Sequence, residues 1–116
     1  MSEAMYPEST VELARRRREL APEQLKAFKQ FSAAVFADGA LSAKTKNLIA
    51  VAVAHVTQCP YCIKGHTREA LKLGATDEEI MEAIWVAAEM RAGGAYAHSA
   101  LAIDTMDHVH ADQSGD

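Results

Sequence analysis

Cys59-Pro60-Tyr61-Cys62-Ile63-Lys64-Gly65-His66 contains both cysteines of the chain and one of its five histidines. If these residues are helical, Cys59 and Cys62 stand at positions i and i+3, and Cys62 and His66 at i and i+4. Side chains at these spacings are neighbours on one helix face. The Cα atoms of an i, i+3 pair lie about 5–5.5 Å apart, which a disulfide tolerates. One helical turn therefore offers two thiols that can bridge and an imidazole that can take a proton.

Helical patterns flank this motif on both sides. Ser42 is the expected N-cap of a helix from about Ala43 to Thr57, and the middle of that helix, from Leu48 to Ala54, is nearly all apolar. A helix with so few polar positions is expected to be buried on most sides. Gly74 marks the end of the cysteine helix, and Thr76 opens a capping box for the next helix.

The two ends of the chain give further helices. Residues 1–9 are expected to form a loose arm, followed by a helix over residues 10–20 and by another that starts at Pro22. Gly93-Gly94 either kinks the helix after Thr76 or separates it from a last helix over about residues 95–106. Strand-like alternation is missing, so we predict an all-α domain of about five or six helices that is oligomeric. We divide the chain into an N-terminal arm with its helix, the main domain and a polar tail that frays, over residues 1–20, 21–106 and 107–116.

Composition and charge exclude several classes of protein. The 116 residues are 49% hydrophobic but only 6% aromatic, which favours one domain of closely packed helices. The formal net charge of −4 argues against a nucleic-acid partner and against an acidic membrane surface, so we interpret Arg15–Arg18 as a solvated helix face. No apolar run reaches the roughly 18 residues of a spanning helix. Residues 1–18 are too polar for a signal peptide, so we expect a cytoplasmic protein.

Several chemistries compete for the spacing of the two cysteines and the histidine. Haem attachment needs a histidine directly after the second cysteine, where Ile63 stands. A structural zinc site needs a fourth ligand beside Cys59, Cys62 and His66, which only His55, His98 or a partner chain could supply. Two buried, inert thiols are a further alternative. Thiol redox chemistry is favoured, because a helix N-terminus, a histidine and a second cysteine each promote the reactive thiolate.

The redox interpretation gives a specific cycle that needs no cofactor and no metal. One thiolate attacks the O–O bond of a hydroperoxide and becomes a sulfenic acid, and the second thiol condenses with it to a disulfide. An external dithiol then reduces the bridge by exchange. Cys62 is the better candidate for the nucleophile because His66 lies one turn further on, and Cys59 is then the resolving thiol. The reverse assignment stays open, since the helix N-terminus also favours a thiolate at Cys59.

The segment from Lys46 to His66 resembles the core motif of the alkylhydroperoxidase D (AhpD)-like proteins, which belong to the carboxymuconolactone decarboxylase superfamily. The segments at Ala70–Ile80 and Ala92-Gly93-Gly94 also fit, so the resemblance covers roughly residues 25 to 105. It implies a small all-α fold that assembles into trimers or hexamers. It also implies peroxidase or disulfide-reductase activity, with a lipoylated adaptor or a thioredoxin-like protein as the dithiol reductant.

The same resemblance implies that Cys59 and Cys62 are the redox pair and that His66 belongs to a proton relay. The family pattern usually adds a glutamate twelve residues before the first cysteine, where this chain has Asn47. Because an amide cannot act as a base, His55, two turns further along the same helix, is a candidate replacement. It is equally interpretable as a hydrogen-bonded core or interface histidine. Glu89 is a weaker candidate for the replacement. The Tyr61 hydroxyl could contact the site, or the Pro60-Tyr61 pair could only shape the turn.

Three hypotheses for the function follow. The leading one is a thiol-dependent alkyl hydroperoxide reductase and antioxidant. The second is a dithiol–disulfide oxidoreductase with little peroxidase activity, and the third is a non-redox oligomeric binding or metal module. Homo-oligomerisation has separate support, because the helix before the cysteines and the Met81–Met90 region are apolar on more than one face.

Overall fold

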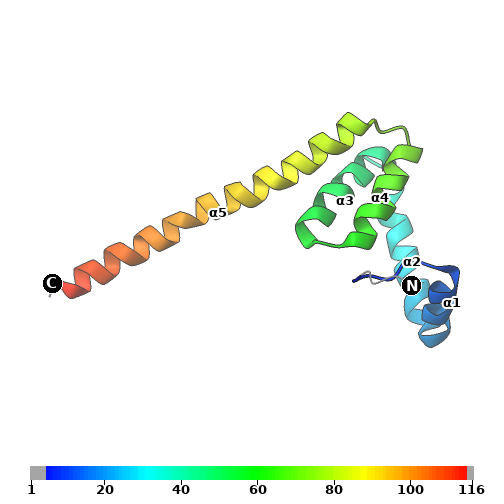
Figure 1. Cartoon of the computed structure of the whole chain (residues 1–116), viewed down its shortest axis with the longest axis horizontal. Helices are drawn as coiled ribbons and strands as arrows, with labels where there is room; N and C mark the ends of the chain where they lie inside the picture. The colour runs from blue at the N-terminus through cyan, green and yellow to red at the C-terminus, as the bar shows by residue number, and fades with distance from the viewer. Residues whose placement is uncertain (1–4, 115–116) are drawn as a thin grey trace.

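The computed structural model describes residues 5–114, and over this range the chain forms five α-helices and no strand. Helices α3 and α4 lie side by side and α5 crosses them, while α1 and α2 lie next to this unit, at the end of the molecule away from the C-terminus (Figure 1). The predicted all-α fold is confirmed. The helices are α1 (Val11–Leu20), α2 (Pro22–Phe36), α3 (Ala43–Thr57), α4 (Pro60–Lys72) and α5 (Asp77–Gln113).

The core is small and lies where α3, α4 and the first turns of α5 meet. Val51 of α3 is fully buried against Ala70, Ala75 and Ile80. The alanines let the helix backbones approach closely, and half-buried leucine and isoleucine side chains complete the cluster. The expectation that α3 is buried on most sides is wrong for the single chain, because three of its apolar side chains are 44–51% exposed, namely Ile49, Val53 and Val56.

Short, well-capped turns hold this unit in place. Gln58 closes α3 in the left-handed conformation (φ 58°), and its backbone N–H donates to the Ala54 carbonyl. Gly74 follows α4 with φ 94°, a conformation that favours glycine. The predicted capping box at Thr76 is confirmed, since its hydroxyl accepts the Glu79 N–H at 3.1 Å and the Glu79 carboxylate accepts the Thr76 N–H at 2.9 Å. These caps fix where α4 and α5 begin.

Helix α5 runs for 37 residues without a break. The predicted kink or break at Gly93-Gly94 is therefore wrong, as is the helix end near residue 106. Each glycine costs a helix only about 1 kcal/mol relative to alanine, and the flanking residues are mostly good helix formers. The expected frayed tail is helical as far as Gln113, and its last two residues lie outside the described range.

The N-terminal helices pack only lightly on the rest of the chain. Helix α1 has no buried residue, and Arg15 bridges Glu12 and Glu19 on its solvated face. Hydrogen bonds to these two carboxylates raise the pKa of Arg15 above its ordinary value, and the bond to Glu12 has the larger effect. The arginine block is thus an exposed helix face, as predicted. Residues 1–4 of the expected loose arm lie outside the described range, whereas Tyr6 and Pro7 contact Tyr61 of α4.

The single chain is strongly elongated. Its radius of gyration is 21.0 Å and its longest extent 66 Å, whereas a compact chain of this length has a radius of gyration of about 13 Å. The C-terminal half of α5 accounts for most of this length, because it extends beyond α3 and α4 (Figure 1). Within the described residues, no helix is long and apolar enough to cross a bilayer.

Candidate active site

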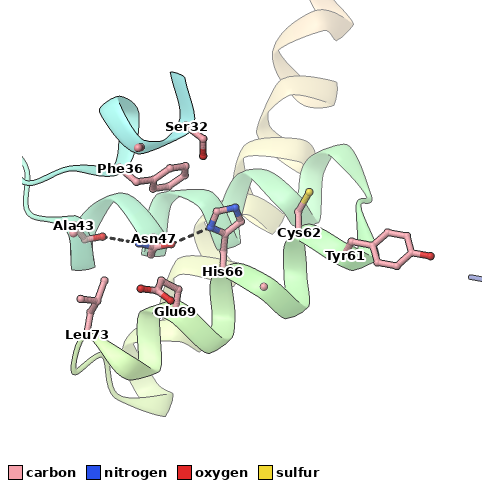
Figure 2. Close-up of a pocket in the computed structure, with 11 residues that line it drawn as sticks. Ser32, Phe36, Ala43, Asn47, Tyr61, Cys62, His66, Glu69 and Leu73 are labelled. Atoms are coloured by element: carbon pink, nitrogen blue, oxygen red, sulfur yellow. Dashed lines mark hydrogen bonds between the residues drawn. The ribbon is translucent and has the colours of Figure 1, made fainter. Parts of the chain in front are cut away.

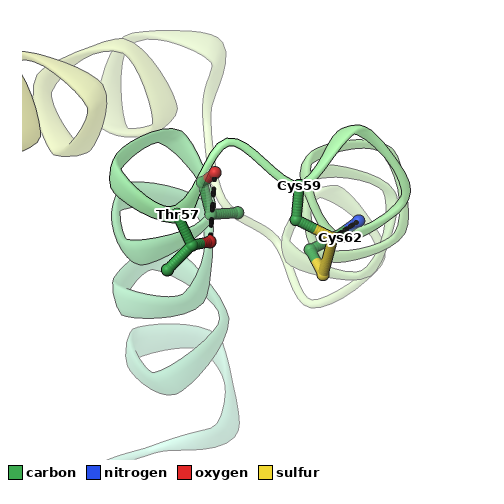
Figure 3. The surroundings of a disulfide bond; sticks show 4 residues. Thr57, Cys59 and Cys62 are labelled. Atoms are coloured by element: carbon green, nitrogen blue, oxygen red, sulfur yellow. Dashed lines mark hydrogen bonds between the residues drawn. A yellow bond between two sulfur atoms is a disulfide. The ribbon is translucent and has the colours of Figure 1, made fainter.

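The two cysteines form a disulfide at the N-terminus of α4 (Figure 3). Cys59 is the N-cap with extended backbone, and its sulfur accepts the backbone N–H of Cys62 at 3.3 Å. Pro60 occupies the first helical position, where its missing N–H costs nothing. The Cα atoms of the pair lie 5.3 Å apart, so the distance expected from an i, i+3 spacing is confirmed. We expected both cysteines inside the helix, whereas Cys59 precedes its first turn.

His66 lies one turn beyond Cys62 and is held by a side chain of α3. Its ring nitrogen Nδ1 lies 2.9 Å from Oδ1 of Asn47, and Nδ2 of Asn47 donates to the Ala43 carbonyl at 2.9 Å. Asn47 is only 3% exposed, which makes it a buried polar residue whose hydrogen bonds are all within the protein. The helix before the cysteines thus fixes the imidazole on the helix that carries them.

A third helix completes the surroundings of the imidazole. The ring of Phe36, at the end of α2, stacks on the ring of His66 with centroids 4.9 Å apart and planes inclined by 24°. Asn47, Cys62, His66 and Phe36 line one pocket of about 610 Å³ between α2, α3 and α4 (Figure 2). The pocket is open to solvent and mostly apolar. Because Cys62 and His66 both line it, a small apolar molecule in the pocket would contact both residues.

The other residues considered from the sequence lie elsewhere. Nδ1 of His55 donates to the Val51 carbonyl of its own helix at 2.7 Å, and His55 does not line the pocket of Cys62 and His66. Glu89 is exposed on α5 and does not line it either. The Tyr61 side chain borders the pocket, but its hydroxyl donates to the Pro7 carbonyl at 2.6 Å. The geometry therefore brings Cys59, Cys62 and His66 together and leaves His55 apart.

Two residues of the pocket were missed from the sequence. Phe36 is the last residue of α2, a helix of which only the start at Pro22 was predicted from the sequence. Glu69 lines the pocket one turn beyond His66, and its spacing of seven residues from Cys62 and three from His66 would have identified it. The contact of Phe36 with His66 joins residues thirty positions apart, so no local pattern indicates it.

The site has the features that thiol chemistry needs. The backbone N–H of Cys62, in the first turn of α4, points towards the Cys59 sulfur, and such a group favours negative charge on sulfur. His66 supplies a proton acceptor on the Cys62 side. A zinc site finds less support, because within residues 5–114 no group of three or more histidine, cysteine or acidic side chains is arranged to hold a metal ion.

Comparison with known proteins gives consistent matches. The model of the carboxymuconolactone decarboxylase family matches residues 22–105. A Paracoccus denitrificans protein described as uncharacterized protein 4 in the cox locus is 65% identical over 83 residues, which cover 72% of this chain and 75% of that protein.

Solved structures agree with this match. A carboxymuconolactone decarboxylase family protein from Legionella pneumophila has 39% identity and a TM-score of 0.64, with 84% of this chain and 86% of that chain covered. A Thermotoga maritima protein described as belonging to the same family, and suggested to take part in an antioxidative response, has 28% identity and a TM-score of 0.56. The match covers 80% of this chain and 96% of that one.

Proposed function

The chain belongs to the carboxymuconolactone decarboxylase family, and from this premise we propose that it is a thiol-dependent alkyl hydroperoxide reductase with an antioxidant role. The observation that carries the proposal is the disulfide between Cys59 and Cys62, with His66 one turn away in the pocket that Cys62 lines. The Thermotoga maritima relative, described as suggested to act in an antioxidative response, supports the same direction.

The proposed reaction starts from the reduced pair. The Cys62 thiol loses its proton to His66, and the thiolate attacks one oxygen of the hydroperoxide ROOH. The O–O bond breaks, the RO⁻ group takes the proton back from His66, and Cys62 becomes a sulfenic acid while the alcohol ROH leaves. The Cys59 thiol then attacks the sulfenic sulfur, which forms the disulfide and releases water. The structure corresponds to this oxidised state.

An external dithiol closes the cycle. It attacks one sulfur of the bridge, and its second thiol displaces the protein, which leaves two thiols on the chain and a disulfide on the partner. A lipoyl-bearing adaptor or a thioredoxin-like protein has the required chemistry. Because such dithiols keep thiols reduced in the cytoplasm, we propose that compartment.

The second candidate function is dithiol–disulfide exchange with little peroxide turnover. The observation that favours it is Asn47, since an amide at this position cannot take a proton from His66. Exchange of a bridge with an incoming dithiol depends less on such a relay than cleavage of an O–O bond does. In this alternative the sulfur of Cys59, stabilised at the helix N-terminus, is a good leaving group.

We also propose that the chain forms a homo-oligomer, a trimer or hexamer. The support is the large apolar surface of the single chain, which includes side chains along the whole of α5 that are more than half exposed. This group contains Trp85, Met90, Leu101 and Ile103. Symmetric self-association is the usual way to bury such a surface.

The proposed function is tested on reduced protein with one equivalent of an alkyl hydroperoxide. We expect both free thiols to disappear and one alcohol to form per chain. The matched variants Cys59→Ser and Cys62→Ser separate the roles, because the variant that keeps the nucleophile still consumes one peroxide and retains a trappable sulfenic acid. Retention of both thiols in the wild-type protein contradicts the proposal. Reduction of lipoamide disulfide without peroxide consumption then selects the second candidate.

A further inference from the structure

The hydrogen bonds of Asn47 determine which nitrogen of His66 carries the proton. The backbone carbonyl of Ala43 can only accept a hydrogen bond, so the Asn47 group facing it at 2.9 Å must be the amide NH₂. The amide oxygen of Asn47 therefore faces His66, again at 2.9 Å. An amide oxygen can only accept, so Nδ1 of His66 donates. The neutral imidazole is then the Nδ1–H tautomer, and Nε2 carries the free electron pair.

The ring has little freedom to escape this arrangement. Asn47 is buried and anchored to its own helix, and Phe36 stacks against the imidazole face. Figure 2 shows the amide of Asn47 on one side of the His66 ring and Cys62 on the other, one turn back along α4. Among residues 5–114, Nε2 of His66 has no hydrogen-bond partner, and Figure 2 shows it on the side of the ring that faces away from Asn47. A proton from the Cys62 thiol would arrive on this side.

We infer that Asn47 is a positioning residue, which holds His66 in the tautomer whose Nε2 accepts the proton of the Cys62 thiol. The catalytic part of this inference rests on the proposed function. Because the amide is neutral and takes no proton, the transfer ends on His66. The proton stays on Nε2 until the O–O bond breaks, and from there it goes to the departing RO⁻ group. The asparagine is therefore not an inert replacement for an acid: it orients His66, which alone carries the proton.

The charges around His66 are few. Glu69, on the same face of α4, is the one formally charged side chain among the described residues that line the pocket. The residues that line it from α2 and α3 are neutral, and they are Ser32, Ala33, Phe36, Ala43 and Asn47. Glu69 is exposed and forms no hydrogen bond with His66, so the variant Glu69→Gln serves as a matched control for a change of charge in the pocket.

The tautomer is tested directly by ¹⁵N NMR of the histidine ring in the oxidised protein, at a pH where His66 is neutral. We expect a protonated Nδ1 and a bare Nε2 in the wild type, in Glu69→Gln and in Asn47→Asp, which keeps the acceptor oxygen. Asn47→Leu removes that oxygen at similar volume, so the spectrum should change to a mixture dominated by Nε2–H. A wild-type spectrum with a protonated Nε2 overturns the inference without any variant.

The consequence for the thiol is measured by alkylation of reduced protein with iodoacetamide as a function of pH, with Cys59→Ser as the background. We expect Asn47→Leu to slow alkylation of Cys62 at neutral pH about 10-fold. Asn47→Asp should shift the His66-dependent limb of the profile to higher pH, by about one pH unit or more, because a carboxylate favours the imidazolium. Identical profiles in all variants overturn the positioning role. None of these readouts uses peroxide, so failure of the proposed function is seen separately.

Discussion

The two halves of α5 both carry apolar side chains but have opposite surroundings. Ile80, in the first turn, is 7% exposed and packs against Val51 of α3, whereas Ile103, six turns later on the same helix, is 54% exposed. The first half completes the core beside the candidate active site, and the second extends beyond α3 and α4 (Figure 1). The difference teaches that an apolar pattern fixes a helix face but not the surface that will cover it. For the second half, we proposed above that this surface is another copy of the chain.

The largest effect is expected on assembly. We predict that Leu101→Asp converts the oligomer to monomers, because it places a charge on an apolar side chain that is 66% exposed in the single chain. Sedimentation velocity measures the result. Ser99→Asp is the control, since residue 99 lies on the opposite side of the helix from residue 101. A wild-type protein that sediments as a monomer would show that no second copy covers this half of α5.

The next effect is expected on the core. Ile80→Ala should lower the free energy of unfolding by about 2–5 kcal/mol, because the methyl groups are removed from a packed site. The same substitution at Ile103 should cost about 0.5 kcal/mol or less in dissociated chains and more in the assembled state. Urea unfolding at several protein concentrations measures both. Equal losses at the two positions, independent of concentration, would show that both halves are covered within one chain.

The smallest effect is expected at the start of α5, which the capping box anchors. The pKa of the Glu79 carboxyl lies below its ordinary value of 4.5. The larger cause is the hydrogen bond from the Thr76 backbone N–H, and the smaller is the Lys44 ammonium, 3.1 Å away. Glu79 therefore contributes stability above that value, and the contribution is lost as the pH falls through the lowered pKa. We expect Glu79→Gln to reduce the midpoint of thermal unfolding slightly at pH 7 and to leave it unchanged near pH 2.

Thermal unfolding of both proteins between pH 7 and pH 2 tests this sign. Glu78→Gln is the control, because its neighbouring carboxylate takes no part in the capping box. A gap between wild type and Glu79→Gln that widens as the pH falls would contradict the prediction. Added salt should narrow the gap at pH 7, since Glu79 and Lys44 are both solvent-accessible.

Local features of the fold were predictable from the sequence, and contacts between helices were not. The spacing of Cys59 and Cys62 and the capping box at Thr76 each involve residues three apart, so helix geometry alone dictates them. The continuity of α5 was missed because a glycine pair is a weak signal, which a long helix overrides.

The active site shows the same limit. The proximity of Cys59, Cys62 and His66 could be predicted, because all three lie within eight residues. Asn47 was interpreted only as a missing acid, since its bond to His66 depends on how α3 packs against α4. Phe36 joins from a third helix. The residues that orient His66 thus come from other helices, and the sequence motif contains only the groups proposed to react.

The ring closed by the disulfide contains only four residues, which limits how much the bond can stabilise the fold. Closing so short a ring removes little freedom from the unfolded polypeptide, about 2 kcal/mol in the chain-entropy view, against nearly 5 for a ring of 100 residues. The Cα atoms already stand at the separation that a helical turn imposes, so making or breaking the bond leaves the backbone where it is. Such a bond adds little stability to the fold, and it fits the cycle of oxidation and reduction proposed above.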